Sequence, residues 1–439
     1  MQFIDSYTFG FSYFFIFVAT FFILYRVVFS KVVFGFFDPY NITTNVTISA
    51  SISLYLYLIF SDYDLTFFKY YYPLYCFEFL FCVYIIDKFV RKFYGRIKLP
   101  CMADSLPNIN VLSMSILIIL ITIATQRGIV LFAEDPNVAK TEIYREGGGA
   151  LRRIIQALLD LYAISLFYEL FNGKLKKVKF LAHSSIYITV VALTSGAKGG
   201  LLAFFIYYML SMYYYNRHID KGKASFLLTL CIGYMFLVVY LGVSDIMIAA
   251  LRIVTRIIGY ADNIFYFLTY DNIVNLFDDR NCFNLLYHTF GTLLASVKLL
   301  DWSQVRTLGG EMFELLTGVY DGRGPNSSLI LEAHVFFGPF YAIFYFAIVL
   351  TIISFMRCIA WSYFNDKKNN TFFAFFLFII FTSMPVYLTV DTSFLGTLFI
   401  DLPLRLIPVI VFYIINRCKG KINATGAKSF CSDSYLELR

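Results

Sequence analysis

Apolar segments of about 20 residues recur along almost the whole of this 439-residue sequence. A helix of about that length, made mostly of apolar residues, can cross the hydrocarbon core of a bilayer. Only 15% of the residues are charged, against roughly a quarter in a typical soluble domain. The sequence therefore predicts an all-α polytopic membrane protein, with residues 1–439 forming a single integral membrane domain.

The apolar segments predict about 11 transmembrane helices. We expect them near residues 9–29, 42–60, 72–90, 109–133, 154–171, 180–194, 201–215, 225–243, 328–355, 371–390 and 394–415. Clusters of Lys and Arg follow every odd-numbered segment in this series. Because cytoplasmic loops of membrane proteins are rich in Lys and Arg, the N-terminus is predicted outside and the C-terminus inside.

This topology leaves two long loops on the outer side of the membrane. The first covers residues 134–153 and the second residues 244–327, while residues 416–439 form a cytoplasmic tail. In the second loop Arg252 and Arg256 are four residues apart in an apolar stretch, which places them on one face of a helix. We therefore expect a large outer loop carrying amphipathic helices that lie on the membrane surface.

Several functional classes lack any sequence signal. The formal net charge of +7 is explained by the basic cytoplasmic loops, so we expect no nucleic acid partner. The sequence has no P-loop, HExxH, GxSxG or Rossmann fingerprint. The eight Cys residues form no CxxC pair and show no spacing typical of a metal site. We therefore expect neither a cofactor nor a metal.

Positive charges on the outer side run against the orientation rule and need another explanation. These residues are Arg145, Arg152, Arg153, Lys198, Arg252, Arg256, Arg280, Lys298, Arg306 and Arg323. Guanidinium groups bind phosphoryl oxygens with paired hydrogen bonds. The sequence predicts a diphosphate-binding surface, and its candidate residues are Arg145, Lys198, Arg252, Arg256, Arg323 and Asn326. Alternatives stay open, since Lys198 suits a solvated turn, and Arg252 and Arg256 suit contact with lipid head groups.

Residues 321–328 form a polar turn that leads into a long apolar helix. Ser327 or Asn326 is predicted to cap this helix, because each side-chain oxygen can accept from a free backbone N–H. Glu332 and His334 lie in its first turns, and ionisable groups within a span usually have a polar function. Two positions apart, they point to different faces, so at most one faces a shared cavity.

The sequence indicates four candidates for a catalytic base on the outer side. Glu332 and His334 are joined by Asp262, six residues after Arg256, and by Asp391, in the turn between the last two spans. The residues alone do not choose among them.

Gly324-Pro325-Asn326-Ser327-Ser328, followed by Leu331-Glu332 and Phe337-Gly338, resembles the bacterial O-antigen polymerases, the Wzy-type repeat-unit polymerases. The segment from Thr194 to Gly200 is similar to a short Ser/Gly break of that family, in which the basic residue is commonly Arg. In this sequence it is Lys198, which puts bidentate phosphate binding at that position in doubt.

The resemblance implies a metal-independent membrane glycosyltransferase of the GT-C type, on the periplasmic face of the bacterial inner membrane. Its substrates are lipid-linked: a growing glycan moves from undecaprenyl diphosphate to the non-reducing end of a new undecaprenyl-diphosphate-linked repeat unit. Outer Arg and Lys residues would stabilise the diphosphate, and Glu332, His334 or Asp262 would accept the hydroxyl proton. The lipid bilayer and a polysaccharide chain-length regulator are the other implied partners.

Two other functions remain as alternatives. An O-antigen ligase would move the glycan to lipid A-core, but such ligases often carry His before the Asn of this motif, where Pro325 stands. A lipid-linked oligosaccharide flippase would be expected to show internal repeats, which are not evident in the sequence.

Overall fold

The computed structural model describes residues 11–61, 63–93, 106–129, 148–195, 198–215, 228–229, 231–237, 239–240, 245–250, 253, 261–277, 280–301, 304–318, 327–365 and 371–433. Every regular element in these ranges is a helix, and no strand occurs in them. The predicted all-α class is therefore confirmed.

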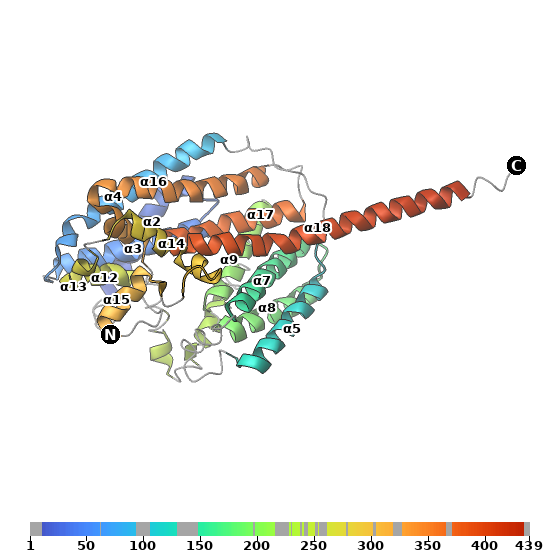
Figure 1. Cartoon of the computed structure of the whole chain (residues 1–439), viewed down its shortest axis with the longest axis horizontal. Coiled ribbons are helices and arrows are strands. Elements are labelled where there is room, and N and C mark those ends of the chain that lie inside the picture. Colours follow the sequence, from blue (N-terminus) through green and yellow to red (C-terminus); the bar gives the residue numbers. More distant parts are fainter. Residues whose placement is uncertain are drawn as a thin grey trace. The chain divides into compact units, whose positions relative to one another are not determined.

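The longer helices follow the predicted apolar segments (Figure 1). The elements are α2 (Phe11–Val27), η1 (Phe29–Lys31), α3 (Pro39–Phe60), η2 (Phe67–Tyr70), α4 (Tyr72–Val90), η3 (Arg91–Phe93), α5 (Ile109–Arg127), α7 (Gly148–Phe171), α8 (Lys177–Ser195), α9 (Lys198–Tyr214), α12 (Asp262–Thr269), α13 (Asp271–Leu276), α14 (Cys282–Ser296), α15 (Leu308–Thr317), α16 (Leu329–Asn365), α17 (Phe372–Ser383), η7 (Met384–Thr389) and α18 (Ser393–Asp433). Each predicted segment except the eighth overlaps at least one of them, and in the eighth the described residues, 228–229, 231–237 and 239–240, are helical as well.

Six helical segments in the described ranges are long and apolar enough to cross a membrane. They are Pro39–Phe60, Ile109–Gln126, Leu151–Phe171, Leu329–Asn365, Phe372–Thr389 and Ser393–Ile414. Two apolar helices, Phe14–Val27 and Gly200–Tyr214, are shorter. These helices agree with a membrane-embedded protein, whereas the count of about eleven spans and the GT-C likeness stay predictions.

Local sequence explains where several helices begin. Asp38 precedes α3, its side chain accepts from the backbone N–H of Tyr40, and Pro39 occupies the first helical position, where no N–H is needed. Asn108 caps α5 in the same way, by accepting from the N–H of Asn110. Both helix starts are therefore readable from the sequence.

Helix α16 is broken near its N-terminal third. Gly338 has φ 65° and ψ −178°, a conformation that favours glycine because a Cβ atom would be strained there. Pro339 follows and has no backbone N–H to continue the helical hydrogen bonds. The segment therefore consists of two helical parts joined at a bend.

The chain divides into two compact units. Unit 1 contains Met1–Ile97, Ala197–Ser362 and Phe378–Ile400, and unit 2 contains Lys98–Gly196, Tyr363–Leu377 and Asp401–Arg439. The sequence predicted a single membrane domain and gave no sign of this division.

In unit 1, Arg357 of α16 forms a buried ion pair with Asp38. Its guanidinium nitrogens donate to the two carboxylate oxygens at 2.9 and 2.7 Å. Only 2% of the Arg357 side chain is exposed, and Tyr40 and Phe34 lie under the guanidinium with ring centroids at 5.0 and 5.5 Å. Because Asp38 also caps α3, one carboxylate holds the start of α3 against α16.

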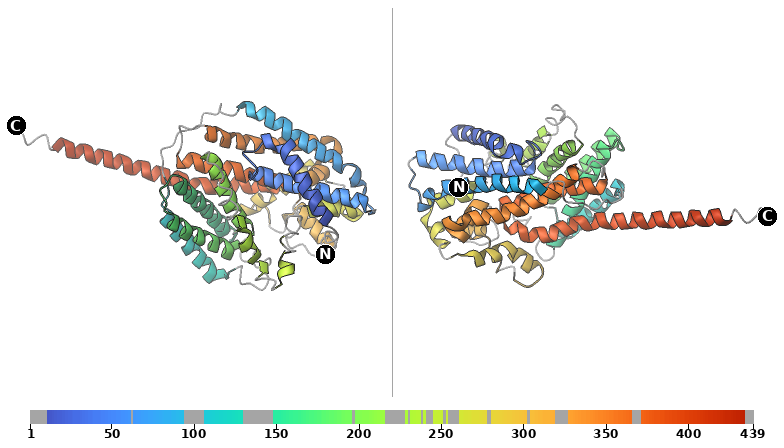
Figure 2. Two further views of the ribbon diagram at one scale, coloured as in Figure 1. Left: turned by 180° about the vertical axis from the view of Figure 1, so that it is seen from behind. Right: turned by 90° about the horizontal axis from the view of Figure 1, so that it is seen from above.

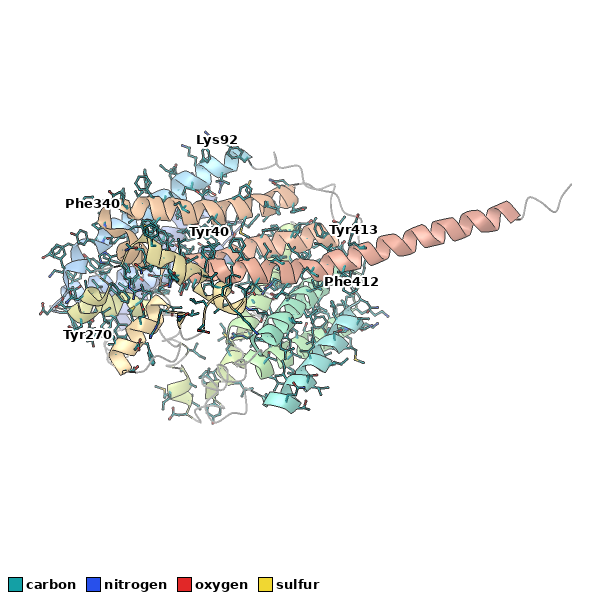
Figure 3. All side chains as sticks on the ribbon, in the orientation of Figure 1. Tyr40, Lys92, Tyr270, Phe340, Phe412 and Tyr413 are labelled. Atoms are coloured by element: carbon teal, nitrogen blue, oxygen red, sulfur yellow. The ribbon has the colours of Figure 1, made fainter. Side chains whose placement is uncertain are left out.

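The other face of α16 is apolar and exposed. Phe340, Phe344, Ile348 and Phe355 recur at helical spacing, and 85% of Phe340 is accessible. The side chain of Phe340 is labelled in Figure 3. Such a face suits contact with lipid chains, because burying it against them removes apolar surface from water.

Helices α5, α7 and α8 pack side by side in unit 2 (Figures 1 and 2). Charged residues of α7 meet charged residues of α18 in this unit. Arg405 donates to Asp160 at 2.7 Å, and Arg153 donates to Asp401. Each of these four charges therefore has a partner of opposite sign, as the cost of a lone charge in hydrocarbon requires.

We expect Arg357→Ala to destabilise the protein by about 3–5 kcal/mol, because it leaves the buried carboxylate of Asp38 without its partner. Thermal unfolding in detergent measures the change. Lys177→Ala is the control, since Lys177 is exposed and such substitutions usually change stability by less than about 0.5 kcal/mol. Equal melting curves for both variants would contradict the structural role of the ion pair.

Candidate active site

The start of α16 is tied to the loop that precedes α18. Ser328 has φ 54°, and such left-handed backbone in a residue other than glycine costs about 1–3 kcal/mol. Its N–H donates to the carbonyl of Val390 at 2.8 Å, and its side chain accepts weakly from the N–H of Leu331 at 3.4 Å. The helix cap is therefore Ser328 rather than the predicted Ser327; Asn326 lies outside the described residues.

Ser327 instead takes part in a buried cluster around Glu332. No part of Glu332 is exposed, and its Oε1 accepts from the Ser327 hydroxyl and, at 3.0 Å, from the N–H of Thr392. Its Oε2 accepts from the hydroxyls of Tyr345 at 2.6 Å and Thr392 at 2.8 Å. Both carboxylate oxygens are therefore well supplied with donors.

The contact with Tyr345 depends on the break in α16. Tyr345 is 13 residues beyond Glu332, and 13 residues of straight helix span about 20 Å. That distance exceeds the reach of the two side chains, so the bend at Gly338 and Pro339 must bring the two parts of α16 together. The bend is thus part of the site.

His288 of α14 completes the cluster. Its Nε2 is 3.1 Å from Oε1 of Glu332 and 3.4 Å from Oδ1 of Asp391, and only 4% of its side chain is exposed. Since both neighbours are hydrogen-bond acceptors, we assign a proton to Nε2. Asp391 Oδ1 also accepts from the N–H of Ser393 at 2.8 Å, at the start of α18.

The surroundings of His288 favour its charged form. Burial alone lowers the pKa of His288, but the hydrogen bonds and charges of Asp391 and Glu332 outweigh burial and raise this pKa to about 10. For Asp391, burial raises the pKa, whereas the hydrogen bond and charge of His288 lower it below the ordinary value. His288 is therefore an imidazolium and Asp391 a carboxylate at neutral pH.

A polar cavity of about 190 Å³ adjoins the cluster. Its walls include Arg280, Asn284, His288, Gln304, Arg306 and Glu311. Arg280 donates to Glu311 at 2.9 Å, and Arg306 donates to Glu314 at 2.6 Å. Both arginines are therefore ion-paired where they line the cavity. The cavity combines cationic donors with a carboxylate, as a polar ligand would require.

His288, Glu332 and Asp391 also form a group with metal-ligand chemistry, because one ligand atom of each lies within 4.8 Å of the others. The hydrogen bonds around Glu332 do not fit a metal ligand, since both of its oxygens already accept from Ser327, Tyr345 and Thr392. The donor set fits a protonated histidine between two carboxyl groups better than a bound cation.

The predicted base candidates lie in different places. Glu332 and Asp391 belong to the cluster, whereas Nδ1 of His334 is 2.8 Å from the hydroxyl of Tyr75. Glu332 and His334 therefore point to different faces, as their spacing predicts. Asp262 is the first residue of α12, and its Oδ1 accepts from the N–H of Asn263, which is a local contact outside the cluster.

The side chains of all five cations predicted for the diphosphate-binding surface lie outside the described ones. Arg145, Arg252, Arg256 and Arg323 lie outside the described residues. Lys198 is the first residue of α9, and its side chain is outside the described ones. Their assignment to a diphosphate-binding surface stays a prediction.

His288 was not among the predicted site residues. The same argument that selects His334, an ionisable side chain within an apolar stretch, applies to the sequence from Phe283 to Leu294 and would have selected His288. Arg280 and Arg306 were recognised as outward cations, but nothing local distinguishes them from the other eight.

In the part of the chain that the structure describes, the fold and the cluster define an all-helical protein with six candidate membrane spans and a buried histidine–carboxyl site beside a polar cavity. In comparison with known proteins, no family model, no curated protein and no solved structure matches this chain.

Tyr345→Phe is expected to destabilise the protein by about 1.5–3 kcal/mol, because it removes a hydrogen bond to the buried carboxyl of Glu332. Tyr341→Phe on the same helix is the matched control, since 62% of Tyr341 is exposed. Chemical or thermal unfolding of the two variants gives the comparison. A smaller loss for Tyr345→Phe than for the control would refute the hydrogen bond's contribution.

The charge on His288 predicts a pH-dependent stability. Its folded-state pKa of about 10 lies above the ordinary 6.5, so its stabilisation is complete below about pH 6.5 and is lost as the pH rises through about 10. The gap in melting temperature between wild type and His288→Gln should therefore narrow over this range. A gap that stays constant would show that His288 is neutral throughout.

Proposed function

We propose that this protein is a membrane glycosyltransferase that polymerises O-antigen or a similar surface polysaccharide. It transfers a growing glycan from undecaprenyl diphosphate to the non-reducing end of a new undecaprenyl-diphosphate-linked repeat unit, on the periplasmic face of the inner membrane. The observation that carries this proposal is the polar cavity with cations and a carboxylate next to the first turns of an apolar helix, α16. A substrate with a lipid tail and a charged head requires such a neighbourhood.

Cations in the cavity suit the leaving group. When the glycosidic bond of the donor breaks, undecaprenyl diphosphate leaves with the bonding electrons and gains negative charge. Fixed positive groups that meet this charge stabilise the transition state, and they can do so without a metal. Arg280 and Arg306 line the cavity and supply such groups.

Glu311 is the carboxylate best placed to accept the proton. It is the only carboxylate that lines the cavity among the described residues, and one of its oxygens is hydrogen-bonded to Arg280. As the acceptor hydroxyl oxygen bonds to the anomeric carbon, its proton passes to Glu311 and the bond to the diphosphate oxygen breaks. Glu332 is less suited to this role because its oxygens already accept several hydrogen bonds.

Purified protein in detergent, given lipid-linked repeat units from its own host and EDTA, tests the proposal. We expect a ladder of lengthened glycans on a gel. Glu311→Gln should slow polymerisation by about 100-fold or more, the range that a general base contributes. Glu314→Gln is the matched control. Glu314 lies on the same helix as Glu311 and also pairs with an arginine, Arg306, but it does not line the cavity.

Other products would point to other functions. Transfer of glycan to added lipid A-core, with no ladder, would identify a ligase. Passage of the substrate across liposome membranes without a new glycosidic bond would identify a transporter and refute the enzyme.

A further inference from the structure

His288 connects the buried carboxyl groups with the cavity. Its Nε2 faces Glu332 and Asp391, and His288 is also one of the residues that line the cavity. The other ring nitrogen, Nδ1, is buried and has no hydrogen-bond partner among the described residues. Since buried polar atoms are almost always hydrogen-bonded, Nδ1 lacks a partner that an acceptor atom of a bound ligand would supply.

The charge balance of the cluster depends on His288. Glu332 receives its other hydrogen bonds from the neutral groups of Ser327, Tyr345 and Thr392. Within the described residues, the ion pairs of Glu332 and Asp391 are both with His288. Two neighbouring carboxylates in a buried place are costly unless a positive charge lies between them. Among the described residues, the imidazole ring of His288 is the group that supplies this positive charge.

We propose that His288 is a permanently charged imidazolium that donates its Nδ1–H to an oxyanion bound in the cavity, and that it does not accept protons. Glu332 and Asp391 are positioning residues: their carboxyl groups accept from Nε2, which orients the ring and stabilises its positive charge. The ligand class is a phosphoryl oxyanion, whose oxygens accept strong hydrogen bonds from charged donors. This inference rests on the proposed function for its choice of site, but it predicts binding of a phosphoryl oxyanion, which can be measured without glycan transfer.

The other charged groups around the ring agree with this role. Arg280 and Arg306 line the same cavity and add positive charge for an anion, while Glu311 is engaged by Arg280. Behind the ring, Tyr345 donates to Glu332 and supports its negative charge. The raised pKa of His288 is consistent with this arrangement, in which the cation remains charged throughout the physiological range.

Nuclear magnetic resonance of protein labelled with ¹⁵N-histidine tests the charge directly. The chain has four histidines, so the spectrum of His288→Gln identifies the His288 signals by difference. We expect both ring nitrogens of His288 to remain protonated between about pH 5 and 8, where a free histidine titrates. A His288 signal that titrates near 6.5 would overturn the proposal.

Glu332→Gln provides a second variant that keeps the shape of the cluster. It removes one of the two negative charges that face Nε2, so the His288 signals should begin to titrate at a lower pH than in the wild type. Unchanged titration in this variant would show that Glu332 does not hold the charge.

Binding of inorganic pyrophosphate, measured by calorimetry on the full-length protein in detergent, tests the ligand class. We expect pyrophosphate to shift the Nδ1 signal, and His288→Gln to bind it about tenfold more weakly or worse, as loss of a charged hydrogen bond implies. His183→Gln is the matched control, because His183 is bonded to Tyr162 in unit 2. Equal binding by His288→Gln and wild type, or no binding by wild type, would refute the site.

Nanodiscs distinguish the source of the oxyanion. If phosphatidylglycerol added to phosphatidylcholine discs displaces pyrophosphate, a lipid headgroup shares the site; if it does not, the site takes diphosphate-like ligands. If the protein binds pyrophosphate through His288 but forms no glycan ladder, this inference is supported and the proposed function is refuted.

Discussion

The described site depends on the hydrogen bonds that the buried carboxyl group of Glu332 accepts. A carboxyl group removed from water is costly unless hydrogen bonds and charge replace the lost hydration. Glu332 obtains these contacts from the residue before α16, from the far part of α16, from α14 and from the loop before α18. One side chain therefore determines where these segments meet, and the position of the cavity wall follows from it.

Charged residues elsewhere obey the same constraint. In unit 1 the pair of Arg357 and Asp38 is almost fully buried, and in unit 2 Arg405 and Asp160 form another buried pair. Replacing such a pair by apolar residues can be neutral for stability, whereas removing one partner is costly. We infer that these pairs chiefly specify which helices lie together, because an incorrect arrangement would leave a charge alone in an apolar environment.

The sequence predicted helices and some of their properties because these depend on neighbouring residues. The apolar segments, the caps at Asp38 and Asn108, and the opposite directions of Glu332 and His334 all follow from helical spacing. The predicted cap of α16, Ser327, was wrong by one residue, because Ser328 caps the helix. Ser327 has a suitable side chain, but Glu332, five positions away, engages its hydroxyl and leaves capping to Ser328.

The sequence by itself determined an all-helical chain with membrane-spanning segments and a short set of ionisable candidates, because hydrophobic length and period are local properties. Only the tertiary structure decided that His288, Glu332 and Asp391 meet, across 44 positions in one case. Gly338 and Pro339 are a local signal for a break in the helix, but only the tertiary structure shows that this break brings Tyr345 to Glu332. Hydrogen bonds between distant segments leave no local pattern, because they exist only when the whole unit has packed.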